Sequence, residues 1–239
     1  DFDSVERART QRTRAILVVS PNNPTGSYLK RDELSQLSRL GLPVISDEVF
    51  ASYPLTEDPR RVRTALEMDA VLVFALGGLS KLAALPQFKL GWIGVGGPKA
   101  LVEEALGRIE LIADAYLTAA PPLQLALPAL MDSRGVAHAA ISARLKNNLE
   151  QLRSCLGPSA AVPLPVQGGW YAVLRLPAVL DEESWAIRLI ERDGVWAHPG
   201  FFYDFAQEPF LVLSLLTPPA EFALGVERIR RRVEHPEAA

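Results

Sequence analysis

The chain of 239 residues has 49% hydrophobic and 22% charged residues, a composition typical of a globular protein with an ample core. Its formal net charge of −3 gives no reason to expect binding to nucleic acid or to an anionic membrane surface. The single cysteine, Cys155, excludes an internal disulfide bond, and no apolar run of the sequence reaches the length of a membrane span. These features predict a cytoplasmic protein.

The first half of the chain alternates between strand and helix patterns. Apolar runs predict strands at about 15–20, 43–47, 70–76 and 91–96, with helices at about 30–40 and 98–113. In the first helix, Leu34, Leu37 and Leu40 are spaced to share one buried face. Strands that alternate with helices favour a mostly parallel sheet, in which ligands bind at the carboxyl ends of the strands.

The second half of the chain has a different pattern. A helical pattern runs from 121 to 156, with a break near 133–135, and a small α+β unit follows. The elements predicted for that unit are strands at 168–176 and 210–216 and helices at 182–192 and 220–233. We expect a large domain over residues 1–135, and a connecting helix with a small C-terminal domain over 136–239. The histidines lack the spacing of metal ligands, so we predict no metal site.

Three polar motifs follow three successive predicted strands. They are Asn-Pro-Thr-Gly beginning at Asn23, Asp-Glu beginning at Asp47, and Ser-Lys ending at Lys81. A lysine held partly desolvated at a strand end has a lowered pKa and can act as a nucleophilic amine. Each motif also has a structural interpretation, namely a turn, an exposed strand end and a solvated loop lysine. All three motifs occur at strand ends in one order, which favours a shared site.

The order of these motifs resembles that of the aspartate aminotransferase superfamily, the class I and II aminotransferases of fold type I. The resemblance implies the cofactor pyridoxal 5'-phosphate (PLP). It also implies that Asn23 contacts the phenolic oxygen of PLP, that Asp47 pairs with its ring nitrogen and that Lys81 binds it covalently. The segments 168–171 and 198–202 resemble small-domain signatures of the family. The implied fold is that of the PLP-dependent transferases of fold type I, with a large domain incomplete at its N-terminus.

The sequence departs from the family pattern at four positions. Phe50 stands where many relatives have a tyrosine that donates to the phenolic oxygen of PLP, and Gly78 stands where a phosphate-binding serine is common. Lys89 replaces the usual phosphate-binding arginine, which keeps the charge but loses the bidentate fork. Val212 aligns with the arginine that binds the substrate carboxylate. Arg175 is an alternative carboxylate ligand, although an exposed surface position explains it as well.

Three functions remain open at this point. The first is an aminotransferase that acts on an amino acid or amine and a 2-oxo acid, and the second is a carbon–sulfur β-lyase with the same cofactor residues. The third is a non-catalytic PLP-binding domain of a transcription regulator. Relatives have a long segment ahead of the Asn-Pro-Thr-Gly strand, so we expect a fragment with weak PLP binding and little activity. The resemblance further implies a homodimer for the full-length protein.

Overall fold

The computed structural model describes residues 1–157, 159–205 and 209–236. The chain divides into two compact units. The first unit consists of Asp1–Asn22, Tyr28–Ser52 and Glu57–His138, and the second consists of Asn23–Ser27, Tyr53–Thr56 and Ala139–Ala239. Two short loop segments from the first half of the sequence therefore belong to the second unit.

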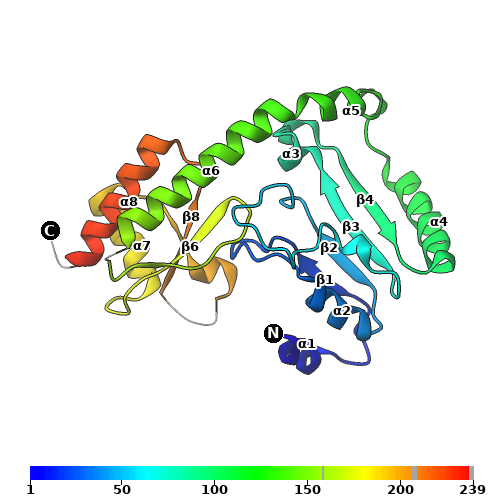
Figure 1. Ribbon diagram of the computed structural model, residues 1–239, viewed down its shortest axis with the longest axis horizontal. Helices are drawn as coiled ribbons and strands as arrows, with labels where there is room; N and C mark the ends of the chain where they lie inside the picture. The colour runs from blue at the N-terminus through cyan, green and yellow to red at the C-terminus, as the bar shows by residue number, and fades with distance from the viewer. Residues whose placement is uncertain (158, 206–208, 237–239) are drawn as a thin grey trace. The chain divides into compact units, whose positions relative to one another are not determined.

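The first unit is built on a four-stranded sheet with the order β1-β2-β3-β4 (Figure 1). The strands are β1 (Ile16–Val19), β2 (Val44–Asp47), β3 (Val73–Gly78) and β4 (Gly91–Gly96), close to the predicted bounds. The first three are parallel, as the alternating pattern predicts, whereas β4 is antiparallel to β3. The segment between β3 and β4 holds only two short helical turns, and a parallel pairing would need a longer crossover connection.

Helices and apolar side chains pack against part of this sheet. The helices of the first unit are α1 (Phe2–Ala8), α2 (Arg31–Arg39), α3 (Leu79–Leu82), α4 (Lys99–Tyr116) and α5 (Pro121–Ser133), with the 3-10 turns η1 (Ala65–Glu67) and η2 (Pro86–Phe88). The predicted face of α2 buries Leu34 and Leu37. They pack in one cluster with Val44 and Val73 of the sheet and with Ala65 of η1. The burial of these side chains fixes the parallel strands and therefore the position of their carboxyl ends.

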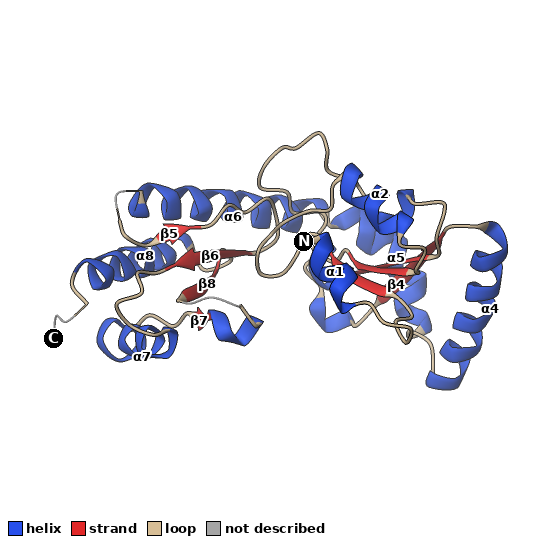
Figure 2. Cartoon of the chain, turned by 90° about the horizontal axis from the view of Figure 1, so that it is seen from below, coloured by secondary structure: helices blue, strands red, loops and turns tan. Residues whose placement is uncertain are grey.

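The second unit contains an antiparallel sheet with the order β5-β6-β8-β7. Its strands are β5 (Val162–Pro163), β6 (Tyr171–Arg175), β7 (His198–Pro199) and β8 (Phe210–Ser214). Its helices are α6 (Gly135–Leu156), which begins just beyond the predicted break, α7 (Glu182–Asp193) and α8 (Pro219–Glu234), with the 3-10 turn η3 (Gly200–Tyr203). Figure 2 shows these helices around the four strands. The predicted small α+β unit is therefore present.

The core of the second unit lies between the sheet and the helices. Fully buried leucines of α6 and the buried Trp185 of α7 contribute to it, together with apolar residues of β6 and β8. Asn148, also buried, donates hydrogen bonds to the carbonyl oxygens of Leu215 (2.9 Å) and Thr217 (2.8 Å). These bonds satisfy backbone groups just beyond β8. No helix within the described ranges is both long and apolar enough to cross a membrane.

Candidate active site

The carboxyl ends of the three parallel strands lie at one edge of the first unit's sheet. Val19 pairs with Asp47, and Asp47 pairs with Leu76, so the three strands end in register. The backbone continues this alignment, because the N–H of Ser20 donates to the carbonyl of Asp47 (2.9 Å) and that of Glu48 donates to Leu76 (3.0 Å). The ends of the three strands that precede the three predicted motifs therefore lie side by side.

Lys81 lies in α3, which begins directly after β3. Its Nζ atom is 5.5 Å from the centroid of the Phe50 ring, and Phe50 is buried. A cation over an aromatic face is attracted by the ring quadrupole, so this contact positions the amine beside the segment that follows β2. The structure thus brings together two of the predicted site residues, Lys81 of the Ser-Lys motif and Phe50, which lies three residues beyond Asp47.

Gly78 is explained by the tight turn between β3 and α3. A Cβ atom at this position would lie 3.2 Å from the carbonyl oxygen of Leu90 and 3.4 Å from the Cα atom of Gly91. The N–H of Leu79 also donates to Leu90 at 3.0 Å, which holds the turn against the start of β4. A serine here, as in the family pattern, would require the neighbouring backbone to shift by a few tenths of an ångström.

Asp47 and Glu48 are neighbours with different environments. The Oε1 atom of Glu48 accepts hydrogen bonds from Ser46 Oγ (3.0 Å) and from the N–H of Ala65 (2.7 Å), so this carboxylate holds η1 against the end of β2. Asp47 Oδ1 accepts the N–H of Val49 at 3.1 Å. Within the described part of the chain, Asp47 Oδ2 has no hydrogen-bond partner. Asp47 therefore keeps an oxygen for a ligand, whereas Glu48 is structural.

The two other predicted cofactor residues lie at exposed positions. Lys89 follows η2 with a left-handed backbone (φ +53°), and no described side chain forms an ion pair with it. Asn23 belongs to the second unit and is also exposed, three residues beyond the Ser20 that bonds to Asp47. Their roles toward the cofactor remain predictions.

A cavity of about 390 Å³ lies within the first unit, between the segment that follows β2 and the strands β3 and β4. Its lining includes Ala51 and Ser52, which follow Phe50. It also includes Gly78 and Leu82, which stand on either side of the segment 79–81 that ends with Lys81. Ser52 Oγ is buried and has no hydrogen-bond partner among the residues that the structure describes. An unsatisfied buried hydroxyl costs free energy unless a ligand or water pairs with it. Ser52 is thus a candidate ligand contact that no motif of the sequence indicates.

The rim of this cavity is also shaped by Trp92. A Cβ atom on Gly77 would lie 2.3 Å from Trp92 Nε1, so the indole ring lies against the bare backbone of β3. Only glycine allows this close approach. The size of the cavity falls within the range of small-molecule sites, and its polar groups are few. The residues that line it include Glu48 and Ser52 but neither Lys81 nor Asp47, so the place of the cofactor relative to this cavity remains a prediction.

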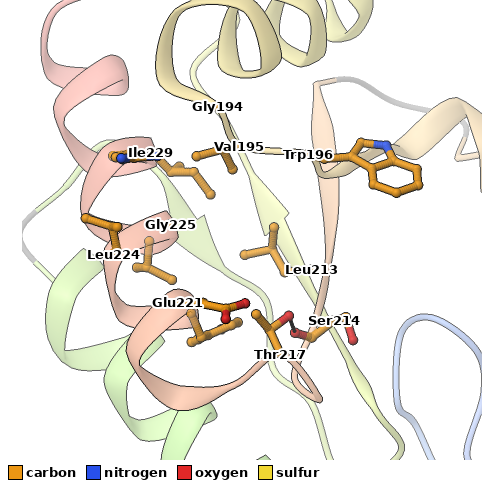
Figure 3. Close-up of a pocket in the computed structure, with 13 residues that line it drawn as sticks. Gly194, Val195, Trp196, Leu213, Ser214, Thr217, Glu221, Leu224, Gly225 and Ile229 are labelled. Atoms are coloured by element: carbon orange, nitrogen blue, oxygen red, sulfur yellow. Dashed lines mark hydrogen bonds between the residues drawn. The ribbon is translucent and has the colours of Figure 1, made fainter.

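A separate cavity of about 350 Å³ lies within the second unit, where α8 faces β8 and the segment 194–196 (Figure 3). Its lining mixes apolar residues with polar ones such as Thr217, Glu221 and Arg228, and the described residues around it include none of the predicted site residues. Val212, the position aligned with the carboxylate-binding arginine, is only 3% exposed in the middle of β8. Arg175 is exposed at the end of β6, which agrees with the surface interpretation.

The motif order predicts a lysine just after one strand and an aspartate at the end of the neighbouring parallel strand. Lys81 and Asp47 have this arrangement. The model of the family "Aminotransferase class I and II" matches residues 1–229. The chain belongs to this family. Its members use PLP, and the site described above contains the lysine, the aspartate and the buried hydroxyl that such a cofactor could engage.

Individual relatives agree with the family assignment. The chain is 26% identical to nicotianamine aminotransferase B of Hordeum vulgare over 96% of its own length and 44% of that protein. It is 32% identical to an S-alkyl-thiohydroximate lyase of Arabidopsis thaliana over 55% of its own length and 30% of that protein. A solved aminotransferase from Escherichia coli matches 98% of the chain with a TM-score of 0.83 at 20% identity, which shows the fold.

The chain spans only part of these relatives, with 44% of the barley protein and 61% of the Escherichia coli chain covered. The predicted fold type I architecture is confirmed by the structural match. The sheet and the site described here correspond to a portion of the relatives' length. Activity, substrates and assembly are therefore properties of the whole protein.

Proposed function

We propose that the full-length protein is a PLP-dependent aminotransferase that moves an amino group between an amino acid or amine and a 2-oxo acid. The observation that carries the proposal is the position of Lys81. It follows β3 directly, its amine lies over Phe50, and Asp47 ends the neighbouring parallel strand. When bound, PLP acts as an electron sink that allows a proton to leave the carbon bearing the amino group.

The residues of the first unit have separable tasks in this proposal. Lys81 would hold the cofactor covalently, and its amine would take up and return a proton as general base and acid. The free oxygen of Asp47 pairs with the ring nitrogen, because an anion there favours the protonated ring. The Ser52 hydroxyl and the Lys89 ammonium supply polar contacts to the cofactor's oxygen atoms.

Borohydride reduction of the PLP-loaded full-length protein, followed by peptide mapping, tests the role of Lys81. We expect the reduced cofactor on the peptide that contains Lys81, and no label in the Lys81→Ala variant. Lys99→Ala is the matched control, because Lys99 is exposed on α4 and makes only a 3.8 Å ion pair with Glu103. Label on another lysine of the wild-type protein would overturn the assignment.

A carbon–sulfur β-lyase is the second candidate. It is favoured by the similarity to the plant protein named as a lyase, and this similarity extends over 55% of the chain. Both reactions use the same cofactor residues, so the products decide between them. An aminotransferase yields a 2-oxo acid only when an amino-group acceptor is present, whereas a β-lyase releases ammonia and a thiol without one.

We also propose that the full-length protein is a cytoplasmic homodimer. Support comes from α4, on which Leu101, Leu111, Ile112 and Tyr116 are all exposed. Contiguous exposed apolar side chains mark association surfaces more often than free surface. Sedimentation of the full-length protein should give the mass of a dimer, and Ile112→Glu should shift it toward the monomer. An unchanged mass for this variant would remove α4 from the interface. Cell fractionation tests the location.

A further inference from the structure

The cavity beside α8 combines two opposite charges with apolar walls (Figure 3). Glu221 and Arg228, both of α8, are its charged lining residues. The apolar walls come from α8, from β8 and from the segment that follows α7, and they include Val195, Leu213, Phe222, Val226 and Ile229. All of these residues belong to the second unit. The cavity can therefore be analysed as a site of that unit alone.

The two charges of the cavity are not neutralised by neighbouring side chains. Among the residues that the structure describes, Glu221 and Arg228 have no ion-pair partner. Arg228 donates from Nη1 to the carbonyl oxygen of Asp193 at 2.8 Å, and this neutral acceptor leaves the positive charge of the guanidinium in place. Figure 3 shows the carboxylate of Glu221 turned toward Thr217. Seven residues separate the two charged positions, which is about 10 Å along a helix axis.

Gly225 leaves open space between the two charged positions. It lies four residues after Glu221 and three before Arg228, and these spacings place all three on one face of α8. A Cβ atom on Gly225 would meet no other atom within 4 Å, so neighbouring side chains do not require a glycine here. Glycine inside a helix is unfavourable relative to alanine. The absence of a side chain at this position keeps the middle of the cavity open.

The segment 194–196, which forms one wall of the cavity, is fixed by the end of α7. Gly194 has a left-handed backbone (φ +61°), and the N–H of Val195 donates to the carbonyl oxygen of Leu189 at 2.8 Å. The bond from Arg228 to the carbonyl of Asp193 pairs a further backbone group at the same helix end. This wall is therefore in place before a ligand arrives, which lowers the entropy cost of binding.

We propose that this cavity binds a small zwitterion whose ammonium and carboxylate groups stand at opposite ends of an apolar chain. The ligand's carboxylate pairs with Arg228, its ammonium group pairs with Glu221, and its chain passes over Gly225 along the apolar wall. A ligand with a single charge would leave one of the two protein charges without a partner. Trp196, which is 79% exposed, adds apolar surface at the rim. The inference does not depend on the reaction proposed for Lys81.

Calorimetric titration of the full-length protein with four small probes tests the proposal. The first, 8-aminooctanoate, carries both charges at the ends of a long chain. Octanoate lacks the ammonium group, octylamine lacks the carboxylate, and 4-aminobutanoate has both charges on a chain too short to span the two positions. We expect 8-aminooctanoate to bind about threefold or more tightly than each of the others, the scale of a partly exposed ion pair. Equal affinities, or tighter binding of any other probe, would overturn the proposal.

Two substitutions locate the charged contacts. Glu221→Gln should remove the preference for 8-aminooctanoate over octanoate, and Arg228→Gln should remove the preference over octylamine, because each deletes the charge that the simpler probe cannot use. Glu183→Gln and Arg231→Gln are the matched controls and should leave both ratios unaltered. Glu183 is exposed in the first turn of α7, as Glu221 is in that of α8, and Arg231 is exposed on α8 away from the cavity lining. Equal weakening of both probes, with unchanged ratios, would show a structural defect and overturn the assignment.

Gly225→Leu tests the cavity itself. The leucine side chain would occupy the open space, so the affinity for 8-aminooctanoate should fall by about tenfold or more. The Tm should be unchanged or raised, since leucine is a better helix former than glycine. Gly225→Ala adds a single methyl group and should keep most of the affinity. Wild-type affinity in Gly225→Leu would place the binding elsewhere on the protein and overturn the proposal.

Discussion

Glu182→Gln is expected to destabilise the second unit strongly, although it changes one atom of a side chain. The carboxylate is buried at the start of α7, and each of its oxygens accepts one backbone N–H. Glutamine keeps one accepting oxygen and places an NH2 group against the other N–H donor. A hydrogen bond to a charged group is worth about 1.5–3 kcal/mol, and an unpaired buried donor costs about 1–3 kcal/mol. The smaller desolvation cost of an amide offsets part of this loss. We expect the free energy of unfolding to fall by about 2–4 kcal/mol.

The assay is urea-induced unfolding of the full-length protein, combined with hydrogen exchange of the backbone amides. Exchange at Phe201 and Phe210 should accelerate in the variant, because the side-chain oxygens that protect them are lost or rotated. Glu183→Gln is the matched control, since Glu183 is the exposed next residue of the same first turn. Both substitutions remove a negative charge near the helix N-terminus, so the control accounts for the dipole contribution.

Exposed substitutions away from special features usually change stability by less than about 0.5 kcal/mol, which is the expectation for Glu183→Gln. If the two variants lose the same free energy, helix electrostatics accounts for the effect and the two backbone bonds are unimportant. If stability falls while the amides of Phe201 and Phe210 keep their protection, the loss arises elsewhere. Either result would refute the structural role assigned to Glu182.

Three other predictions follow from local geometry. Phe50→Tyr adds a donor for the phenolic oxygen of PLP, so an absorbance titration of the loaded protein should show a lowered pKa of the cofactor chromophore. The Arg230 guanidinium, which donates to Glu227, lowers the pKa of that carboxyl group to about 2. This stabilisation is present above the usual pKa and is lost as the pH falls through 2. NMR titration should show a higher Glu227 pKa in Arg230→Ala. Gly26→Ala should destabilise the protein by about 2 kcal/mol or more, because φ at Gly26 is +74° and the added Cβ would lie 2.3 Å from a valine methyl group. Gly225→Ala is the control: Gly225 lies in a helix with open space around it, so this substitution should be neutral or stabilising by about 0.5–1 kcal/mol.

Most of the large-unit fold follows from sequence periodicity. The positions of β1, β2 and α2 agree with apolar runs and with the spacing of Leu34 and Leu37, because burial of one face sets that spacing. The direction of β4 could not be predicted in the same way. It depends on the length of the link through α3 and η2, and the four residues of α3 are too few to show a periodic pattern.

The candidate site shows a similar division. Motif order places Lys81 and Asp47 at neighbouring strand ends, because parallel strands bring successive loops to one edge. Sequence alone could not show that Ser52 Oγ is buried and unpaired in the described structure, since this depends on how the chain folds after Phe50. It also could not show that Glu48 has a structural role, because the backbone of Ala65, to which Glu48 bonds, is distant in sequence.

Three of the four departures from the family pattern share a physical explanation. At Gly78 the backbone of the next strand leaves little room for a side chain, at Phe50 a buried ring lies beside the lysine amine, and Val212 fills a buried sheet position. Each position exchanges a polar side chain for close packing. If the same ligand chemistry is retained, polar contacts must come from neighbouring positions whose side chains still have unused hydrogen-bonding capacity. Ser52 in the first unit meets that condition among the described residues, and it lies two residues beyond Phe50.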